Sequence, residues 1–460
     1  MQKNLFYGSL MDMLDSKDPL VVLADTIKWS KFEDEFAQYY SKEGRPAKPI
    51  RLMVGLLLLK QLENLSDENV VIAWKRNPYF QYFCGFSDFQ TALPCHSTDL
   101  VYFRNRIGKK GFEFIFKHSI EIHSNENLNE SQVIADTTIQ ESNLTYPTDG
   151  KLAIKIINHL HKIVKVENIK LRRSYIKEIK QHRINLRFFR HPKKIIKAKA
   201  SMKRLRTIAK TILRDIDRKF GDNLELHNKY ATKFYLYIRV LLQEKNTKNK
   251  IYSLHEIDAY AVNKGKDHKG YEYGTKASVV TTKNSGIIVG VSAHRENEHD
   301  SKTLKLALEN TISNLGSKTI NEVICDRGYR GSKQIIINNE TVIDISIPSN
   351  QQKKDTPEQI NIKKEKFRRR AAIEPIIGHL KSDHRMQRNY LKGFIGDQIN
   401  LLLAATAFNL KKWMNIYFYA FFTGNLSLLK EAYQQLQHQK ELIMFLLQLK
   451  ITMKFSNLDY

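Results

Sequence analysis

The stretch FRRRAAIEPIIGHLK, residues 367–381, places one acidic residue among several strong bases. In a helix, residues spaced by three, four and seven positions share one face. In this stretch that face carries Phe367, Arg370, Glu374 and Lys381. Such a face is either a surface salt-bridge ladder or a carboxylate metal ligand flanked by cations that bind phosphate. Other features of the sequence are needed to distinguish between these two interpretations.

Composition indicates a folded protein that binds a polyanion. The chain has 460 residues, of which 42% are hydrophobic and 10% aromatic. This is enough apolar material for two or three globular domains and excludes a disordered chain. The formal net charge is +27, which favours nucleic acid as the partner and an anionic membrane as the second choice.

The cysteines and the apolar stretches favour the cytoplasm. Cys84, Cys95 and Cys325 form no C-x-x-C pair, so neither a zinc knuckle nor a disulfide framework is expected. The first residues are acidic where a signal peptide needs an apolar core. The longest apolar stretches have about a dozen residues, whereas a membrane helix needs roughly 20. We expect a soluble, nucleoid-associated protein without a membrane partner.

Residues 1–125 are predicted to be helical and to bind DNA or mediate dimerisation. The segment 49–74 contains two apolar helical runs, and SDEN in it predicts an N-cap at Ser66. The pair resembles a helix-turn-helix. A later helix is predicted to have Ser97 or Thr98 as its N-cap and to stop at a glycine within 97–111. The alternative is a helical bundle that does not contact DNA.

The rest of the chain predicts a mixed α/β domain. Its elements are expected in the order strand, large insertion, two strands, helix, strand, helix, strand, helix. The two consecutive strands flank Asn284-Ser285-Gly286 and predict a hairpin, and the first helix is expected to end at Gly316. The predicted strands lie in SQVIADTTI (131–139), YEYGTKASVVTT (271–282), GIIVGVSAHR (286–295), NEVICDRGYRG (321–331) and TVIDISIP (341–348).

The insertion, residues 151–250, holds most of the charge. It contains 29 lysines and arginines against 7 acidic residues, a net +22 of the chain's +27. Aromatic and aliphatic residues alternate with the cations, so folded helices that contact the phosphate backbone are expected. The alternatives are a solvated face and a disordered segment. The candidate DNA contacts in its densest part are Lys193, Lys194, Lys197 and Lys199.

Three acidic residues are candidates for a metal site. Asp136 and Asp326 lie near the ends of predicted strands, and Glu374 lies on a predicted helix. Carboxylates that converge repel one another unless a cation separates them. Oxygen ligands without nearby cysteine or histidine favour Mg²⁺ or Mn²⁺, and two such ions can catalyse phosphoryl transfer. Alternatively, each acid is an ordinary cap or turn residue.

Several blocks resemble one family. DRGYRG (326–331) is similar to an Asp-x-Gly-Tyr block, and ADTTIQESNLTYPTDGKL (135–152) to a first-aspartate block. The opening stretch matches the pattern Y-x2-R-x3-E-x6-K, with Phe367 in the tyrosine place. Segment 388–413 and the N-terminal segments also fit. Over about residues 30–413, the chain resembles a bacterial insertion-sequence DDE transposase of the IS-five-type family.

The resemblance implies an RNase H-like catalytic domain over residues 126–412, with the basic helical insertion at about 151–250. Residues 1–125 would form the helical N-terminal domain. Residues 413–460 lie beyond the resemblance and are expected to form a helical tail, because their apolar residues have helical spacing. The implied activity is cleavage at the element ends and strand transfer into target DNA. Double-stranded DNA would be the partner, bound by a homodimer in the synaptic complex.

The resemblance also implies roles for individual residues. Two Mg²⁺ or Mn²⁺ ions would be bound by the catalytic acids Asp136, Asp326 and Glu374. DNA near these ions would be held by Arg370, Lys381, Tyr329 and Arg327. Phe367 lacks the hydroxyl with which a tyrosine would bind a phosphate, so no such bond is expected from this position.

Some alternatives stay open at this point. Pro375 either kinks the helix that carries Glu374 or lies at the first position of a helix that Glu374 caps. The segment ENEHD, residues 296–300, is expected to cap a helix, with a role near the metals as the alternative. A catalytically silent DNA-binding regulator and an RNase H-like nuclease are the alternative functions.

Overall fold

The computed structural model describes residues 9–418 apart from 42, 44, 45, 124–127, 190, 245, 264–269, 317–319, 332, 338–340 and 349–354. The chain divides into two compact units. The first comprises Met1–Ile107, Phe114–Asn125 and Thr406–Tyr460, and the second Gly108–Glu113 and Glu126–Ala405. The division at residues 125 and 412 stays a prediction, and most of the predicted tail, from residue 419, lies outside the described residues.

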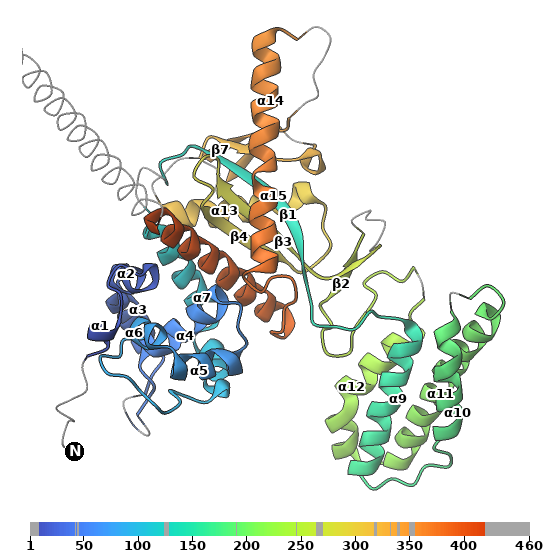
Figure 1. The fold of residues 1–460 in the computed structure, drawn as a ribbon. Helices are drawn as coiled ribbons and strands as arrows, with labels where there is room; N and C mark the ends of the chain where they lie inside the picture. The colour runs from blue at the N-terminus through green and yellow to red at the C-terminus, as the bar shows by residue number, and fades with distance from the viewer. Residues whose placement is uncertain are drawn as a thin grey trace, which may run out of the picture. The chain divides into compact units, whose positions relative to one another are not determined.

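The N-terminal part of the chain is helical, as its apolar periodicity predicts. Ser66 caps α5 as expected, because its side chain accepts a hydrogen bond from the backbone N–H of Asn69. The helices are α1 (Leu10–Met13), α2 (Pro19–Thr26), α3 (Trp29–Ala37), α4 (Ile50–Leu62), α5 (Asp67–Arg76), α6 (Pro78–Phe83) and α7 (Ser97–Glu121) (Figure 1).

Both ends predicted for α7 are wrong. Its N-cap is His96, whose side chain accepts a hydrogen bond from the backbone N–H of Thr98. The helix does not stop at a glycine either. Gly108 has a φ of 55° and kinks the chain, after which the helix continues to Glu121. Glycine adopts this positive φ at little cost, so here it bends the helix without ending it.

Helix α4 forms the centre of the core of the first unit. Its residues from Leu52 to Leu62 are all buried, which explains why the sequence shows no polar face. The buried charge of Lys60 is neutralised by Asp67 at 2.8 Å, and Arg104 contacts the same carboxylate at 2.6 Å. Pairing is needed because an isolated buried charge is strongly destabilising.

The second unit contains a mixed sheet with seven strands among the described residues. The order is β2-β3-β1-β5-β7-β6, and β4 pairs with β3. Strand β1 is antiparallel to β3 and parallel to β5, and β5 is parallel to β7. The strands are β1 (Gln132–Glu141), β2 (Tyr260–Val262), β3 (Glu272–Thr282), β4 (Ile288–His294), β5 (Glu322–Ile324), β6 (Gln334–Ile337) and β7 (Thr341–Ser346). The predicted mixed α/β class is confirmed.

Three details of the predicted strands are wrong. The short strand β2, which precedes the hairpin, is absent from the prediction. Asp136 lies in the middle of β1, because pairing with β3 extends β1 as far as Glu141. Between β5 and β7, the described chain forms the 3-10 turn η2 (Arg327–Tyr329) and strand β6 where a helix was predicted. The isoleucines of β6 favour a strand, and β6 pairs antiparallel with β7.

The predicted hairpin and the helix after it are confirmed. Strands β3 and β4 pair around Gly286, which has a φ of 61°. Helix α13 (Asp300–Leu315) follows and ends at Gly316. The helix packs closely on β4, since a Cβ atom at Gly290 would lie only 2.0 Å from the Thr311 hydroxyl.

The insertion is a bundle of helices that lie side by side (Figure 1). Its helices are α9 (Asp149–Val166), α10 (Ile176–Asn185), α11 (Ile195–Phe220) and α12 (Leu224–Leu242), with the short η1 (Leu186–Phe188). Buried residues such as Ile156, Leu160 and Ile212 form its core. The cations of this segment are therefore carried on a folded scaffold.

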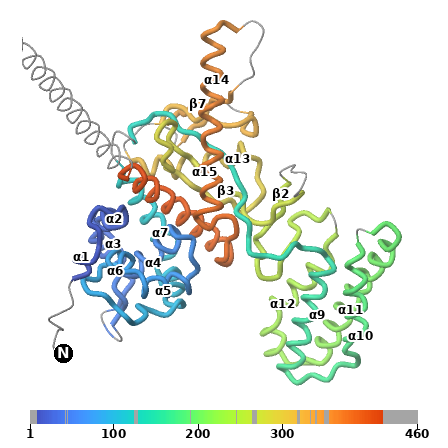
Figure 2. Tube along the Cα trace, in the orientation of Figure 1, coloured from blue at the N-terminus to red at the C-terminus, as the bar shows by residue number. Residues whose placement is uncertain are grey.

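The last described elements are helical. Helix α14 (Pro357–Ala371) leads directly into α15 (Ile373–Ser382), as the chain trace in Figure 2 shows. A further helix covers residues 393–418. Within the described part of the chain, we find no helix that combines the length and apolar character needed to cross a bilayer.

Candidate active site

The sheet register brings Asp136 and Asp326 together. Ile134 of β1 pairs with Ile324 of the parallel strand β5. Each aspartate follows its isoleucine by two residues, and residues two apart in a strand point to the same face. Asp136 remains within β1, whereas Asp326 has left β5 and caps η2. Parallel pairing thus places both carboxylates at one point of the sheet.

Helix α15 adds Glu374 to the same place. Ile373 is fully buried and packs against Ile134 and Ile324, the same pair that sets the strand register. Glu374 follows Ile373 directly, so burial of the isoleucine positions the glutamate beside the two aspartates. The Glu374 side chain itself is 58% exposed.

The structure answers the question raised by Pro375. The helix is interrupted at Ala372, and Pro375 is the third residue of α15, where a backbone N–H has no partner inside the helix. Glu374 is the second residue of α15 and not its cap. Ala372 itself has helical angles, φ −63° and ψ −20°. Arg370 and Glu374 consequently still meet across the interruption, at 2.8 Å.

The guanidinium of Arg370 lies where the three carboxylates converge. Its Nη1 donates to Glu374 Oε1 at 2.8 Å. Its Nη2 lies 3.7 Å from Oδ2 of Asp136 and also 3.7 Å from Oδ2 of Asp326. This single cation therefore offsets the mutual repulsion of three acids. The three acids therefore share one arginine as their common partner.

The second oxygen of each aspartate is held by the backbone. Asp136 Oδ1 accepts a hydrogen bond from the N–H of Thr137 at 2.7 Å. Asp326 Oδ1 accepts one from the N–H of Gly328 at 2.8 Å. These bonds fix the orientation of both carboxyl groups, so that both Oδ2 atoms face Arg370.

The donor set suits a hard divalent cation. Among the described residues, no three acidic, histidine or cysteine side chains are close enough to hold a metal ion together. However, the oxygens that face Arg370 come only from carboxylates, the ligands that Mg²⁺ and Mn²⁺ prefer. They already surround one positively charged group. A metal ion would use the same oxygens, and Arg370 would have to withdraw.

The expected DNA contact of Tyr329 has to be corrected. Its side chain is only 1% exposed, so it cannot reach a DNA strand. Burial, together with the nearby acids, raises the pKa of the Tyr329 hydroxyl well above its usual range. The other expected contacts fit better, since Arg327 is exposed and Lys381 is half-buried. Phe367 is 39% exposed on α14.

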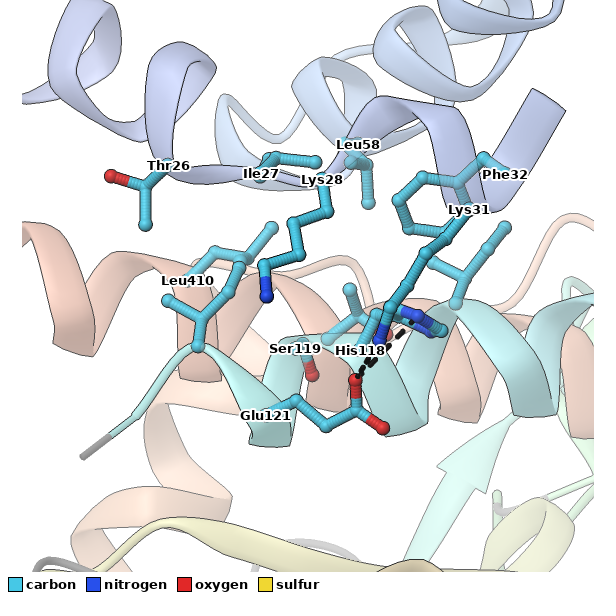
Figure 3. Close-up of a pocket in the computed structure, with 13 residues that line it drawn as sticks. Thr26, Ile27, Lys28, Lys31, Phe32, Leu58, His118, Ser119, Glu121 and Leu410 are labelled. Carbon is cyan, nitrogen blue, oxygen red and sulfur yellow. Dashed lines mark hydrogen bonds and ion pairs between the residues drawn. The ribbon is translucent and has the colours of Figure 1, made fainter. Parts of the chain in front are cut away.

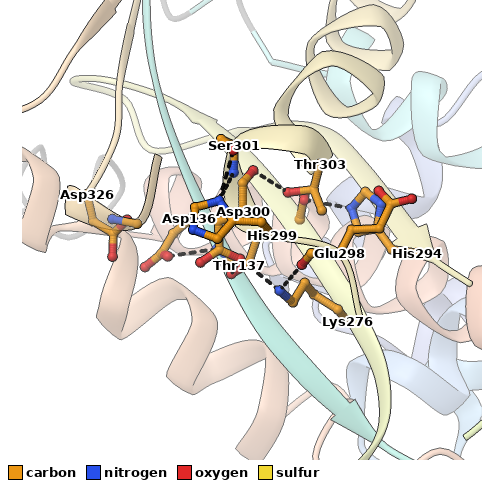
Figure 4. A network of polar contacts seen from close by, with 12 residues as sticks. Asp136, Thr137, Lys276, His294, Glu298, His299, Asp300, Ser301, Thr303 and Asp326 are labelled. Atoms are coloured by element: carbon orange, nitrogen blue, oxygen red, sulfur yellow. Dashed lines mark hydrogen bonds and ion pairs between the residues drawn. The ribbon is translucent and has the colours of Figure 1, made fainter. Parts of the chain in front are cut away.

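A polar network beside the aspartates was only partly anticipated (Figure 4). His299 caps α13, as expected for this segment, and Asp300 is the first residue of that helix. Asp300 Oδ1 accepts hydrogen bonds from the Thr137 hydroxyl at 2.8 Å and from Lys276 at 3.0 Å. The overlooked signal was Lys276, a lysine in a strand whose residues are all buried. A buried lysine requires an acidic partner.

The four lysines predicted to contact DNA are all exposed in the insertion. The ammonium group of Lys194 lies 4.3 Å from the centre of the Phe188 ring. A separate groove of the same bundle is lined by Lys151, Lys155, Arg183 and Arg187 and by no acidic residue. The four exposed lysines predicted to contact DNA, which lie outside this groove, are Lys193, Lys194, Lys197 and Lys199. Cationic surface is thus available on two parts of the bundle.

An apolar cavity of about 170 Å³ lies in the first unit (Figure 3). Phe32, Leu58 and Leu410 contribute to its wall. Lys31 and Glu121 form an ion pair of 3.0 Å beside it. None of the residues predicted to bind metal or DNA lines this cavity, and we assign it no part in the chemistry.

Two family models match the chain. Residues 8–106 match the "Transposase domain (DUF772)", and residues 246–410 match the "Transposase DDE domain". The second match contains Asp326 and Glu374. Asp136 precedes the insertion and lies outside both matches, so its connection to the other two acids comes from the structure, through the sheet register and the contacts of Arg370.

A relative from Rhizobium meliloti, "Uncharacterized protein ORF8 in nfe locus", is 38% identical over 194 residues. The aligned part is 41% of this chain and 94% of the relative. No solved structure matches the chain. On these similarities and the converging acids, the chain belongs to the DDE transposase family.

Proposed function

We propose that this transposase binds the ends of an insertion sequence of the IS-five type and catalyses metal-dependent DNA cleavage and strand transfer. One observation carries the proposal. The carboxylates of Asp136, Asp326 and Glu374, from three separate elements, converge on a single cationic group, Arg370. Acids held this close need positive charge, and phosphoryl transfer uses divalent cations to supply it.

The catalytic domain is proposed to have an RNase H-like fold. The parallel pairing of β1 with β5 supports this, because it aligns the two aspartates. The packing of α15 on the same strands supports it as well, because it adds the glutamate. The helical insertion would then be an addition between β1 and the rest of the sheet.

The three acids would hold two Mg²⁺ or Mn²⁺ ions. When bound, these ions activate a hydroxyl nucleophile and stabilise the leaving oxygen of the phosphodiester. The protein's part is to direct oxygens at them. Asp136 and Asp326 keep Oδ1 on backbone N–H groups and present Oδ2, while Glu374 presents Oε1.

Arg370 would exchange one anionic partner for another. Once it has moved away from the aspartates, its planar guanidinium can bind a DNA phosphate through two parallel hydrogen bonds. Lys381, on the following helix, and Arg327, on η2, would supply further positive charge. The DNA backbone would thus be held beside the acids by groups that do not bind the metal ions.

The remaining DNA contacts would come from the insertion and the N-terminal helices. The exposed cations of the insertion would bind phosphates without regard to sequence. Recognition of the element ends would fall to the helical N-terminal part, residues 1–125. The synaptic complex is proposed to contain a homodimer, so that two element ends are processed together.

Charge-removing substitutions test this assignment. Asp136→Asn, Asp326→Asn and Glu374→Gln keep the side-chain shape and remove one metal ligand each. Each should abolish cleavage and joining of end-containing DNA in Mg²⁺, while DNA binding in a mobility-shift assay persists. Asp383→Asn is the matched control, because Asp383 is an exposed acid directly after α15.

The same assay separates the alternatives. Wild-type protein that cleaves but never joins would be a nuclease, and one that binds without cleaving would be a regulator. If Glu374→Gln retained full cleavage, Glu374 would be only a salt-bridge partner of Arg370 and the assignment would fail.

A further inference from the structure

Asp300 contacts both segments that carry the catalytic aspartates. Its Oδ1 accepts a hydrogen bond from the hydroxyl of Thr137, the residue directly after Asp136 in β1. Its Oδ2 lies against η2, since a Cβ atom built on Gly328 would be 2.9 Å from Asp300 Oδ2 and 3.0 Å from Asp326 Oδ1. The backbone N–H of Gly328 is also the donor that orients Asp326.

Asp300 has a cation of its own. Lys276 Nζ lies 3.0 Å from Asp300 Oδ1 and also donates to the backbone carbonyl of Glu298. The Lys276 side chain is only 7% exposed, whereas that of Asp300 is 27% exposed. Arg370 contacts the other three acids, whereas Figure 4 shows Lys276 at Asp300.

Asp300 is bound to Lys276, whereas Asp136 and Asp326 face Arg370, and this difference indicates different roles for these acids. The oxygens of Asp136 and Asp326 that face Arg370 are turned toward a position where a second cation could replace it. Asp300 Oδ1 is instead bound to a hydroxyl and a buried ammonium group, both fixed on neighbouring strands. A carboxylate bound in this way is suited to hold structure, and less suited to bind a metal ion.

We propose that Asp300 is a positioning residue that clamps Thr137 of β1 to the η2 turn, so that Asp136 and Asp326 present their Oδ2 atoms to one point. Lys276 holds the Asp300 carboxylate in place through the 3.0 Å contact. Gly328 is part of the clamp, because a Cβ at this position would force Asp300 Oδ2 or Asp326 Oδ1 to shift. The inference rests on the proposed function, because it assumes that the position faced by both Oδ2 atoms is a metal site.

The main test removes the clamp without leaving a buried charge. The double variant Asp300→Ala/Lys276→Met removes both members of the ion pair. The matched control is Glu322→Ala/Lys366→Met, which removes another ion pair of the same unit, 3.0 Å long, at the start of β5. Both variants should fold, since replacing an ion pair with apolar groups is often close to neutral for stability.

Two readouts are measured on the full chain. Isothermal titration with Mn²⁺ should show about tenfold weaker binding for the Asp300 double variant than for its control, as is typical when a group that orients a ligand is removed. Hydrogen exchange should be faster at the backbone amides of Thr137 and Gly328, which hold the two Oδ1 atoms. The milder Thr137→Val should shift both readouts in the same direction by a smaller amount.

The outcomes distinguish this inference from the proposed function. If Asp326→Asn bound Mn²⁺ as tightly as wild type, the metal site would be wrong, while the exchange readout would still report on the clamp. If Asp326→Asn lost Mn²⁺ but the Asp300 double variant matched its control in both readouts, the clamp would be refuted. Partial recovery in Asp300→Asn/Lys276→Met, which restores an acceptor for Thr137, would support it.

Discussion

Replacing Arg370 by glutamine should strengthen metal binding. A metal ion and Arg370 Nη2 would use the same oxygens, Oδ2 of Asp136 and Oδ2 of Asp326, each now 3.7 Å from the guanidinium. Arg370→Gln removes the competing charge and leaves a shorter, uncharged polar side chain. We therefore expect tighter binding of Mn²⁺ even though the substituted residue is not a ligand.

The magnitude follows from the two aspartate contacts. Unit charges about 4 Å apart interact by about 1 kcal/mol in water. The three side chains are 15% to 34% exposed, so they are partly shielded from water and this value is a lower bound for each contact. Two contacts then amount to at least about 2 kcal/mol, or about thirtyfold in affinity. The contact with Glu374 is left out, because that side chain is 58% exposed.

The assay is isothermal titration of Mn²⁺ into the full chain at neutral pH, with thermal unfolding measured in parallel. Without metal, Arg370→Gln should lower the unfolding temperature, because three carboxylates lose their counter-charge. Mn²⁺ should then raise it by more than in wild type. Arg370→Lys should be intermediate, since an ammonium group cannot bridge three acids. Arg368→Gln, an exposed position on α14, is the control.

Unchanged or weaker Mn²⁺ binding by Arg370→Gln would refute this reasoning. It would mean that Arg370 supports the metal-bound arrangement and does not compete with it. Cleavage activity does not decide the matter, because removing the group proposed to bind phosphate lowers activity in either case.

The remaining predictions concern the metal, the insertion and the fold of the first unit. Cleavage of end-containing DNA should require Mg²⁺ or Mn²⁺, should not be restored by Zn²⁺, and should stop in EDTA; cleavage that survives chelation would contradict the all-oxygen site. Replacing Lys193, Lys194, Lys197 and Lys199 of the insertion by glutamine should make DNA binding less sensitive to salt. The slope of log K against log salt concentration, where K is the association constant for DNA, should become shallower by up to about 0.9 for each phosphate that is no longer neutralised. An unchanged slope would show that these lysines do not contact the duplex. Burial alone would raise the pKa of Asp67, but Arg104 and Lys60 outweigh it and lower that pKa, so the carboxylate stabilises the fold above its ordinary pKa of 3.8 and loses this effect as the pH falls through the lowered value. Asp67→Asn should cost about 3–5 kcal/mol at neutral pH, measured by denaturant unfolding, because it leaves two buried cations without their partner; a loss below about 1 kcal/mol would show that they relax into solvent.

Much of the architecture could be predicted from local patterns in the sequence. The capped helix after Ser66, the hairpin around Gly286 and the helix ending at Gly316 depend on caps, turn residues and apolar spacing within a few residues. The mixed α/β class and the three candidate acids followed from the same kind of signal. Local signals failed where the outcome depended on pairing between distant segments. Strand β1 continues past Asp136 because β3 pairs with it, and β6 forms beside β7 where a helix was predicted.

The arrangement of the site was decided only by tertiary structure. The sequence places Asp136 and Asp326 on either side of a hundred-residue insertion, and only the pairing of Ile134 with Ile324 brings them together. The sequence motif around Tyr329 predicts that this residue contacts DNA, yet its side chain is buried in the fold. Lys276 and Asp300 show no relation in the sequence, but they form an ion pair beside Asp136 and Asp326. Residue types and short-range spacing determine which chemistry is possible, whereas long-range packing determines which oxygen faces which charge, since Coulomb energies depend on distances that only the folded chain sets.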